Sequence, residues 1–113
     1  NFIEGEGVEA LAESDTLSNL TQLTLTFNPI GLRGAEAIAN SENFRNLTLM
    51  DLYEADLGDR GARALAESKN LPNLETLVLI HNDVREGVQA LFKDNKNFPK
   101  LKDVYFYTAK AEV

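Results

Sequence analysis

Hydrophobic residues recur along this chain with a period of 27 residues. Leu20, Leu47, Leu74 and Leu101 each open a similar segment: LTQLTLTFNPI, LTLMDLYEADL, LETLVLIHNDV and LKDVYFYTAKA. Each segment alternates apolar and polar positions, and an alternation of period two places the apolar residues on one face of a short strand. The pattern therefore predicts four strands, one at the start of each unit. A fixed period of this length is typical of stacked supersecondary units.

The second part of each unit has the composition of a short helix. Alanine-rich segments follow the strands, with apolar residues at offsets of about three and four. Each segment begins at a glycine and ends near Asn or Ser, so we expect the glycine to open the helix. The four helices predicted in this way are Gly7–Leu17, Gly34–Phe44, Gly61–Leu71 and Gly87–Phe98.

Alternating strands and helices at a constant period predict an α/β fold. A strand, a helix and a further strand of the same sense form a right-handed crossover, so the strands make one parallel sheet with the helices on the other side. Helices pack about 10 Å apart and strands about 4.8 Å apart, so the stack bends with the sheet inside. The predicted fold is a right-handed superhelical solenoid, with parallel strands on the concave face and helices on the convex face.

We expect one continuous domain over residues 1–113. It divides into a partial repeat over 1–19, full repeats over 20–46, 47–73 and 74–100, and a terminal strand with its tail over 101–113. Asn1 falls on the repeat position that Asn28 and Asn82 hold later. The numbering thus starts within a unit, and we expect the chain to be a piece of a longer repeat protein.

The pattern LxxLxLxxNxI is carried by Leu20, Leu23, Leu25, Asn28 and Ile30. With a helix following in a unit of 27, it resembles the leucine-rich repeats of the ribonuclease-inhibitor-like class, over essentially the whole chain. Similar families include ribonuclease inhibitors, activators of Ran-type GTPases, NOD-like immune receptors and bacterial effectors. The resemblance implies that the concave face and its rim hold another protein.

Two departures from this family pattern affect the interpretation. The family's asparagine, whose amide pairs backbone groups after the strand, is replaced by Ala55 in the middle unit and by Ala109 in the last. Unless Asp56 or water substitutes, an unpaired backbone group there would cost about 1–3 kcal/mol. Cysteine, common in mammalian ribonuclease inhibitors, is absent.

The charge and composition of the chain restrict its partners and compartment. It has 11 Lys and Arg against 18 Asp and Glu, a net charge of -7. This balance disfavours nucleic acid and anionic membranes and permits a basic protein partner, although it also serves the solubility of the helical faces. The lack of cysteine excludes disulfides and thiolate metal sites and favours a reducing, cytoplasmic compartment. We find no run of apolar residues long enough to span a membrane and no signal peptide.

The outward positions of the strands are the candidate binding surface. They are Gln22, Thr24, Thr26, Leu49, Asp51, Tyr53, Thr76, Val78, Ile80, Asp103, Tyr105 and Tyr107. Exposed apolar area and tyrosines often mark a partner surface, although β-branched and aromatic residues also favour strands for their own sake. The residues expected to bind a protein partner are Leu49, Asp51, Tyr53, Val78, Ile80, Asp103, Tyr105 and Tyr107.

A rim column follows the strands, comprising Phe27, Glu54, His81 and Thr108. We expect Phe27, Glu54 and His81 to extend the binding surface, with the alternative that they are solvated loop residues. His81 is the sole histidine and has no metal-ligand partners at suitable spacing. The serines fall in or after helices. No cofactor, metal or catalytic residue is therefore predicted.

Three functions remain open from the sequence. The first is a non-enzymatic protein-binding module, and the second is a structural spacer or targeting array of a larger protein such as a bacterial effector. GTPase activation is a third, resting on analogy alone, because the arginine and asparagine contacts of the Ran activators have no match here. The terminal strand, Val104–Thr108, is aromatic and would present a sheet edge, so we also expect self-association there.

Overall fold

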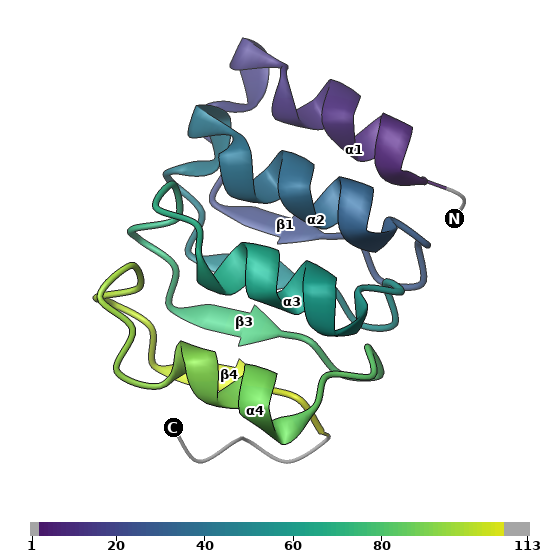
Figure 1. Ribbon diagram of the computed structural model, residues 1–113. Helices are drawn as coiled ribbons and strands as arrows, with labels where there is room; N and C mark the ends of the chain where they lie inside the picture. Colours follow the sequence, from purple (N-terminus) through teal and green to yellow (C-terminus); the bar gives the residue numbers. More distant parts are fainter. Residues whose placement is uncertain (1–2, 108–113) are drawn as a thin grey trace.

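The computed structural model describes residues 3–107, which form two layers (Figure 1). One layer is a parallel sheet whose four strands follow chain order. The strands are β1 (Gln22–Thr24), β2 (Leu49–Asp51), β3 (Thr76–Val78) and β4 (Asp103–Tyr105). The other layer holds the helices α1 (Gly5–Ala12), α2 (Gly31–Asn40), α3 (Gly58–Ala66) and α4 (Glu86–Gln89). The predicted α/β solenoid of alternating parallel strands and helices is confirmed.

The strands pair in register with residues 27 positions away. Leu23 lies beside Met50, Met50 beside Leu77, and Leu77 beside Val104. All four side chains point into the space between the layers and are at most 8% exposed. Because a shift of one residue would turn this row toward solvent, the buried row fixes the register of the sheet.

The helices close the core from the opposite side. Ala35 and Ala62 occupy equivalent positions, and Ile38, Leu65 and Phe92 form a second column of equivalent residues. All are buried, and the small alanines allow neighbouring helices to approach closely. Burying a large apolar side chain contributes about 1.5–3 kcal/mol, so the interlocking columns supply most of the stabilisation.

The predicted starting points of the middle helices are wrong. The helices α2 and α3 begin at Gly31 and Gly58, three residues earlier than expected. These two glycines have φ of 61° and 63°, a left-handed conformation that other residues adopt at a cost. Gly34 and Gly61 lie in the first helical turn instead. Their role is spatial, since a Cβ atom on Gly34 would stand 2.6 Å from the Cβ of Ile30.

The predicted helix ends also need correction. The helices α1 and α2 end at Ala12 and Asn40, and the separate 3-10 helices Asp15–Leu17 and Glu42–Phe44 follow them. In the third full unit Arg85 takes the position of Gly31 and Gly58 and stays extended, so α4 starts at Glu86. It runs directly into a 3-10 helix, Ala90–Phe92, and the expected continuous helix Gly87–Phe98 does not form.

A ladder of polar side chains caps the helices, and the sequence analysis did not predict it. Ser41 Oγ and Asn43 Nδ2 both donate to the Ala12 carbonyl, at 2.6 and 2.9 Å, across to the preceding unit. The same arrangement recurs from Ser68 and Asn70 to Ala39, while Asn95 and Asn97 bind Ala66. These bonds satisfy carbonyls that a helix C-terminus leaves without partners. The recurrent Ser-x-Asn spacing was the available signal.

An arginine joins α1 to α2 by ion pairs. Arg33 Nη2 lies 2.7 Å from Glu9 Oε1, and Arg33 Nη1 lies 3.5 Å from Glu6 Oε1. The hydrogen bond from Arg33 lowers the pKa of Glu9 below its ordinary value of 4.5. The folded state thus binds the Glu9 proton more weakly than the unfolded chain. The stabilisation is present above the ordinary pKa and is lost as pH falls through the lower, folded-state pKa.

We expect Arg33→Gln to return the pKa of Glu9 toward its ordinary value, because the main cause of the shift is removed. An NMR titration of the glutamate side-chain carboxyls measures this directly. Arg60→Gln is the matched control, since Arg60 occupies the same position in α3, and it should leave the titration of Glu9 unchanged. A Glu9 that titrates identically in wild type and Arg33→Gln would contradict the assignment.

Candidate interaction surface

Twelve outward side chains form three rows across the sheet, and we call them the strand face. The first row is Gln22, Leu49, Thr76 and Asp103, and the second is Thr24, Asp51, Val78 and Tyr105. The third row is Thr26, Tyr53, Ile80 and Tyr107. Backbone bonds of 2.9 Å from Phe27 N to Tyr53 O and from Glu54 N to Ile80 O continue the strand register beyond the sheet. The structure thus brings all eight residues of the predicted binding set onto one surface.

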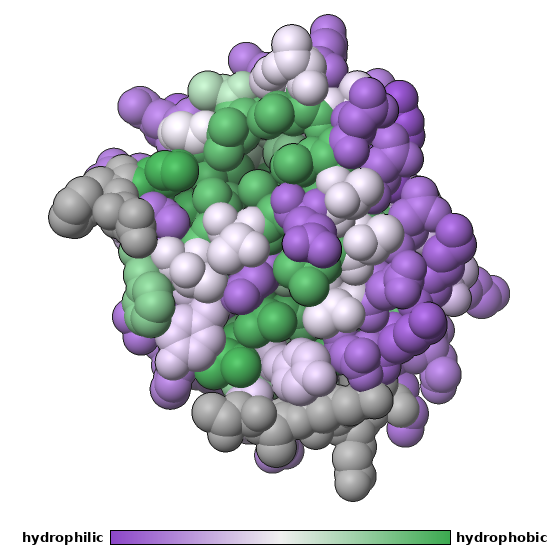
Figure 2. Space-filling view, turned by 180° about the vertical axis from the view of Figure 1, so that it is seen from behind, coloured by the Kyte–Doolittle hydropathy of each residue, from purple (hydrophilic) through white to green (hydrophobic). Residues whose placement is uncertain are grey.

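Figure 2 shows this face of the molecule, with apolar and intermediate side chains over much of its middle, a few hydrophilic ones among them, and a broad hydrophilic region on the right. Leu49, Val78 and Ile80 are partly exposed there. Tyr53 and Tyr105 are also partly exposed, and Tyr107 is 59% exposed. The apolar character therefore extends across three neighbouring repeats and reaches the last described strand.

The rim residues share an unusual backbone conformation. Phe27, Glu54 and His81 have φ of 60°, 50° and 58°, in the left-handed region. The chain turns there from the strand toward the buried asparagine position. A bulky residue with positive φ is rare because its Cβ atom crowds the backbone. The side chain of Phe27 is also 54% exposed, so burial does not compensate for this conformation. Thr108, the fourth residue predicted for this column, lies outside the described residues.

Three rings form a continuous band along the rim, which we call the aromatic band. The Tyr53 ring lies 5.2 Å from the Phe27 ring and 5.3 Å from the His81 ring, between their centroids. The interplanar angles are 65° and 81°, so both contacts are edge-to-face. Such pairs contribute about 0.5–1.5 kcal/mol beyond their buried area. They hold Tyr53 in a defined position at the centre of the candidate surface.

Asn82 anchors the rim from below. Its Oδ1 atom accepts hydrogen bonds from Ala55 N at 2.9 Å and Leu57 N at 3.1 Å. Its Nδ2 atom donates to Leu52 O at 2.7 Å and Ile80 O at 3.2 Å. The side chain is 3% exposed and links the turns of two consecutive repeats. The turns that carry the rim residues are therefore fixed to each other by one amide.

The unpaired backbone group predicted at Ala55 is absent, because Ala55 N donates to Asn82. By analogy with Asn82, an asparagine at position 55 would accept hydrogen bonds from the backbone N–H groups of Asn28 and Ile30, one repeat earlier. There Asn28 N donates to Leu25 O at 3.3 Å, and Ile30 N donates to Asn28 O at 2.7 Å. The turn thus closes on itself and needs no contribution from Asp56.

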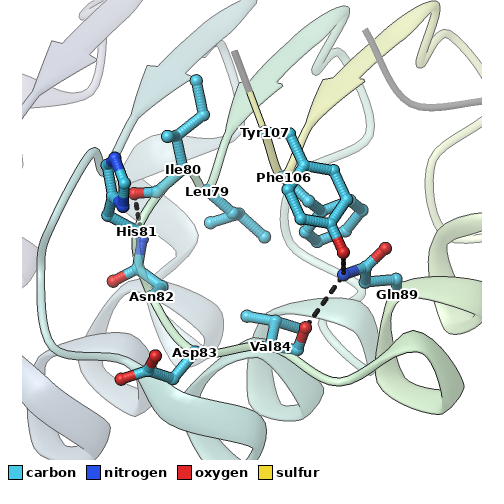
Figure 3. A pocket seen from close by; sticks show the side chains of 9 residues that line it. All are labelled: Leu79, Ile80, His81, Asn82, Asp83, Val84, Gln89, Phe106 and Tyr107. Carbon is cyan, nitrogen blue, oxygen red and sulfur yellow. Dashed lines mark hydrogen bonds between the residues drawn. The ribbon is translucent and has the colours of Figure 1, made fainter. Parts of the chain in front are cut away.

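A pocket of about 340 Å³ lies at the C-terminal end of the rim. Figure 3 shows His81 and Tyr107 on opposite sides of it, with Leu79 between them and Phe106 beside Tyr107. Gln89 Nε2 donates to Val84 O at 2.9 Å and to the Tyr107 hydroxyl at 3.2 Å. The lining combines apolar and aromatic side chains with the polar groups of His81, Asn82, Asp83 and Gln89.

Over residues 3–107, no group of three His, Cys, Asp or Glu is placed to hold a metal ion.

A family model matches part of the chain. Residues 16–39 match the family model described as Leucine Rich repeat, and this segment includes β1, the following turn and most of α2. No protein with a curated description matches the chain. Within the described part of the chain, no helix has the length and apolar character needed to cross a membrane.

Proposed function

Residues 16–39 match a leucine-rich repeat, and the following units repeat its strand and helix with the same period. We propose that the chain is a non-enzymatic module that binds a partner protein through the strand face and the aromatic band. The observation that carries the proposal is the set of apolar and aromatic side chains left exposed on three consecutive strands. Contiguous exposed apolar area rimmed by polar groups is characteristic of protein–protein interfaces. Tyrosine is enriched among the residues that dominate binding energy.

Strand propensity alone does not account for this surface. Aromatic and β-branched residues stabilise strands by packing against cross-strand neighbours. Phe27 and Tyr107 lie outside the strands and keep 54% and 59% of their surface exposed. Phe27 also occupies a left-handed backbone position that glycine or asparagine would fill with less strain. Backbone strain of this kind clusters at functional sites, so a strained Phe27 with an exposed ring favours a role in recognition.

The proposal is tested with the triple variant Tyr53→Ala, Ile80→Ala, Tyr105→Ala. These side chains come from three consecutive repeats of the strand face and are only partly buried, so the fold should survive their truncation. We expect affinity capture by the triple variant to recover at least tenfold less partner than capture by the wild type, since truncating each residue that dominates an interface costs about 1 kcal/mol or more. Quantitative mass spectrometry of the captured proteins provides the measurement.

The control replaces Arg63, Glu67 and Leu91 by alanine, all of which are exposed on the helical side. It should retain the partner. Circular dichroism and thermal unfolding establish that both variants are folded. Equal partner recovery by wild type and a folded triple variant would overturn the proposal and favour the spacer interpretation.

A further inference from the structure

We propose that the occupant of the strand face is a basic segment of the partner protein, with an arginine side chain bound at Tyr53, Asp51 and Glu54. This inference rests on the proposed function and specifies the chemistry of the same surface. Three features carry it: the sign of the charges on the surface, two carboxylates that form no ion pair within residues 3–107, and the aromatic ring beside them.

The charges on the surface have one sign. The strand face and the three rim residues make up fifteen positions, which include Asp51, Asp103 and Glu54 but no Lys or Arg. Every Lys and Arg of residues 3–107 lies elsewhere, chiefly on the helical side and the loops. The nearest in the repeat pattern, Lys102, precedes β4 and lies 3.5 Å from Glu75 Oε1. Complementary charge on a partner would steer its approach and its orientation.

Two of these carboxylates keep their capacity to bind a cation. Asp51 uses Oδ1 to accept the backbone N–H of Tyr53 at 3.0 Å. The ion pairs among residues 3–107 involve other acids, so neither Asp51 nor Glu54 has a basic partner there. A hydrogen bond between a carboxylate and a guanidinium is about twice as strong as a neutral one.

The ring of Tyr53 favours arginine over other basic groups. Asp51 and Glu54 flank Tyr53 along the chain, and edge contacts to Phe27 and His81 hold its ring in place. A planar guanidinium can stack on an aromatic face while its N–H groups bind neighbouring carboxylates. An ammonium group is more strongly hydrated and cannot combine the two contacts in this way.

A second acidic region exists on the helical side, and it serves as a comparison. It surrounds Arg33 and includes Glu9, Glu13, Asp15, Glu36 and Glu42. Arg33 already pairs with Glu9 there, and no aromatic ring lines the region. A cation attracted by negative charge alone would bind there as well, whereas a cation that also needs a ring would bind only on the strand face.

The test begins with a displayed library of random peptides selected on the wild-type protein. Clones that bind wild type but not the Tyr53→Ala, Ile80→Ala, Tyr105→Ala variant depend on the strand face. We expect these clones to carry arginine. In synthetic peptides, replacing that arginine by citrulline, which keeps the shape and removes the charge, should weaken binding about tenfold.

The double variant Asp51→Asn, Glu54→Gln supplies the protein side of the test. Asparagine keeps an oxygen that can accept from Tyr53 N, so the local turn should persist. We expect the arginine peptide to bind this variant about tenfold more weakly, and the citrulline peptide to bind it as it binds wild type. The control variant Glu13→Gln, Glu36→Gln removes two carboxylates from the helical side and should bind both peptides normally.

The outcomes separate this inference from the proposed function. If strand-face clones lack arginine, or if citrulline peptides bind equally well, the cation site is overturned and the protein-binding surface stands. If the arginine peptides depend on Glu13 and Glu36 instead, the site is misplaced and the inference is likewise overturned. If no selected clone depends on the strand face, both the inference and the proposed function are contradicted.

Discussion

Replacing Asn82 by alanine is expected to lower the free energy of unfolding by about 3 kcal/mol or more. The amide makes four hydrogen bonds to backbone groups of Leu52, Ala55, Leu57 and Ile80. The side chain is 3% exposed, so water cannot readily replace these bonds. Each buried group left without a partner costs about 1–3 kcal/mol, and two of the donors share one acceptor.

Urea denaturation followed by circular dichroism measures this loss by linear extrapolation. Asn28→Ala is the matched control, because Asn28 holds the same repeat position but makes only two described side-chain bonds, to Ile3 N and Thr26 O. It should destabilise the protein less than Asn82→Ala does. An Asn82→Ala variant that is no less stable than Asn28→Ala would contradict the assigned role of the amide.

The second large effect is expected at Gly34, where alanine should lower the free energy of unfolding by about 2 kcal/mol. The added Cβ atom would lie 2.6 Å from Cβ and 3.0 Å from Cγ1 of Ile30. Ile30 is 1% exposed and sits at the start of the helix, so it cannot move away without disturbing the core. The steric cost exceeds the gain of up to about 1 kcal/mol that alanine normally brings to a helix.

Gly87→Ala provides the opposite expectation in the same chain. Gly87 also lies in a helix, α4, but a Cβ atom there would meet nothing within 4 Å. Alanine should therefore raise the free energy of unfolding by about 0.5–1 kcal/mol. Chemical denaturation of the two variants gives the comparison. A Gly34→Ala variant that is as stable as wild type or more stable would contradict the packing assigned to Gly34, and a destabilised Gly87→Ala variant would contradict the open space at Gly87.

The strands and their register could be predicted from the sequence for a physical reason. A parallel strand has period two, so Leu23, Met50 and Leu77 could only face the core if their repeats stacked in register. The constant spacing of 27 residues then fixed which residues lie side by side. The outward positions followed directly, which is why the predicted binding residues all lie on one face.

The helix boundaries could not be predicted in the same way. Each of the first two full repeats contains two glycines, Gly31 and Gly34 or Gly58 and Gly61. The first glycine of each pair adopts positive φ, and the second lacks a Cβ atom that would collide with a neighbouring side chain. The amino-acid sequence alone does not distinguish these two roles. The shortening of α4 depends on Arg85 remaining extended with its N–H bonded to Asp59, a contact between repeats.

Contacts across repeats also explain what was missed at the candidate surface. The aromatic band joins Phe27, Tyr53 and His81 from three different repeats, and its edge-to-face geometry depends on the left-handed turns that carry Phe27 and His81. The substitution at Ala55 suggested a broken ladder, but the neighbouring turn rearranged its own hydrogen bonds. Side-chain identity alone does not predict such local compensation.

The most direct test of the central claim is NMR cross-saturation on the labelled chain bound to the protein that it captures. If the partner occupies the strand face, amide signals over residues 49–54, 76–81 and 103–107 should lose intensity on irradiation of the partner. The amides of α1, α2 and α3 should remain unaffected. Intensity losses confined to those helices would contradict the account.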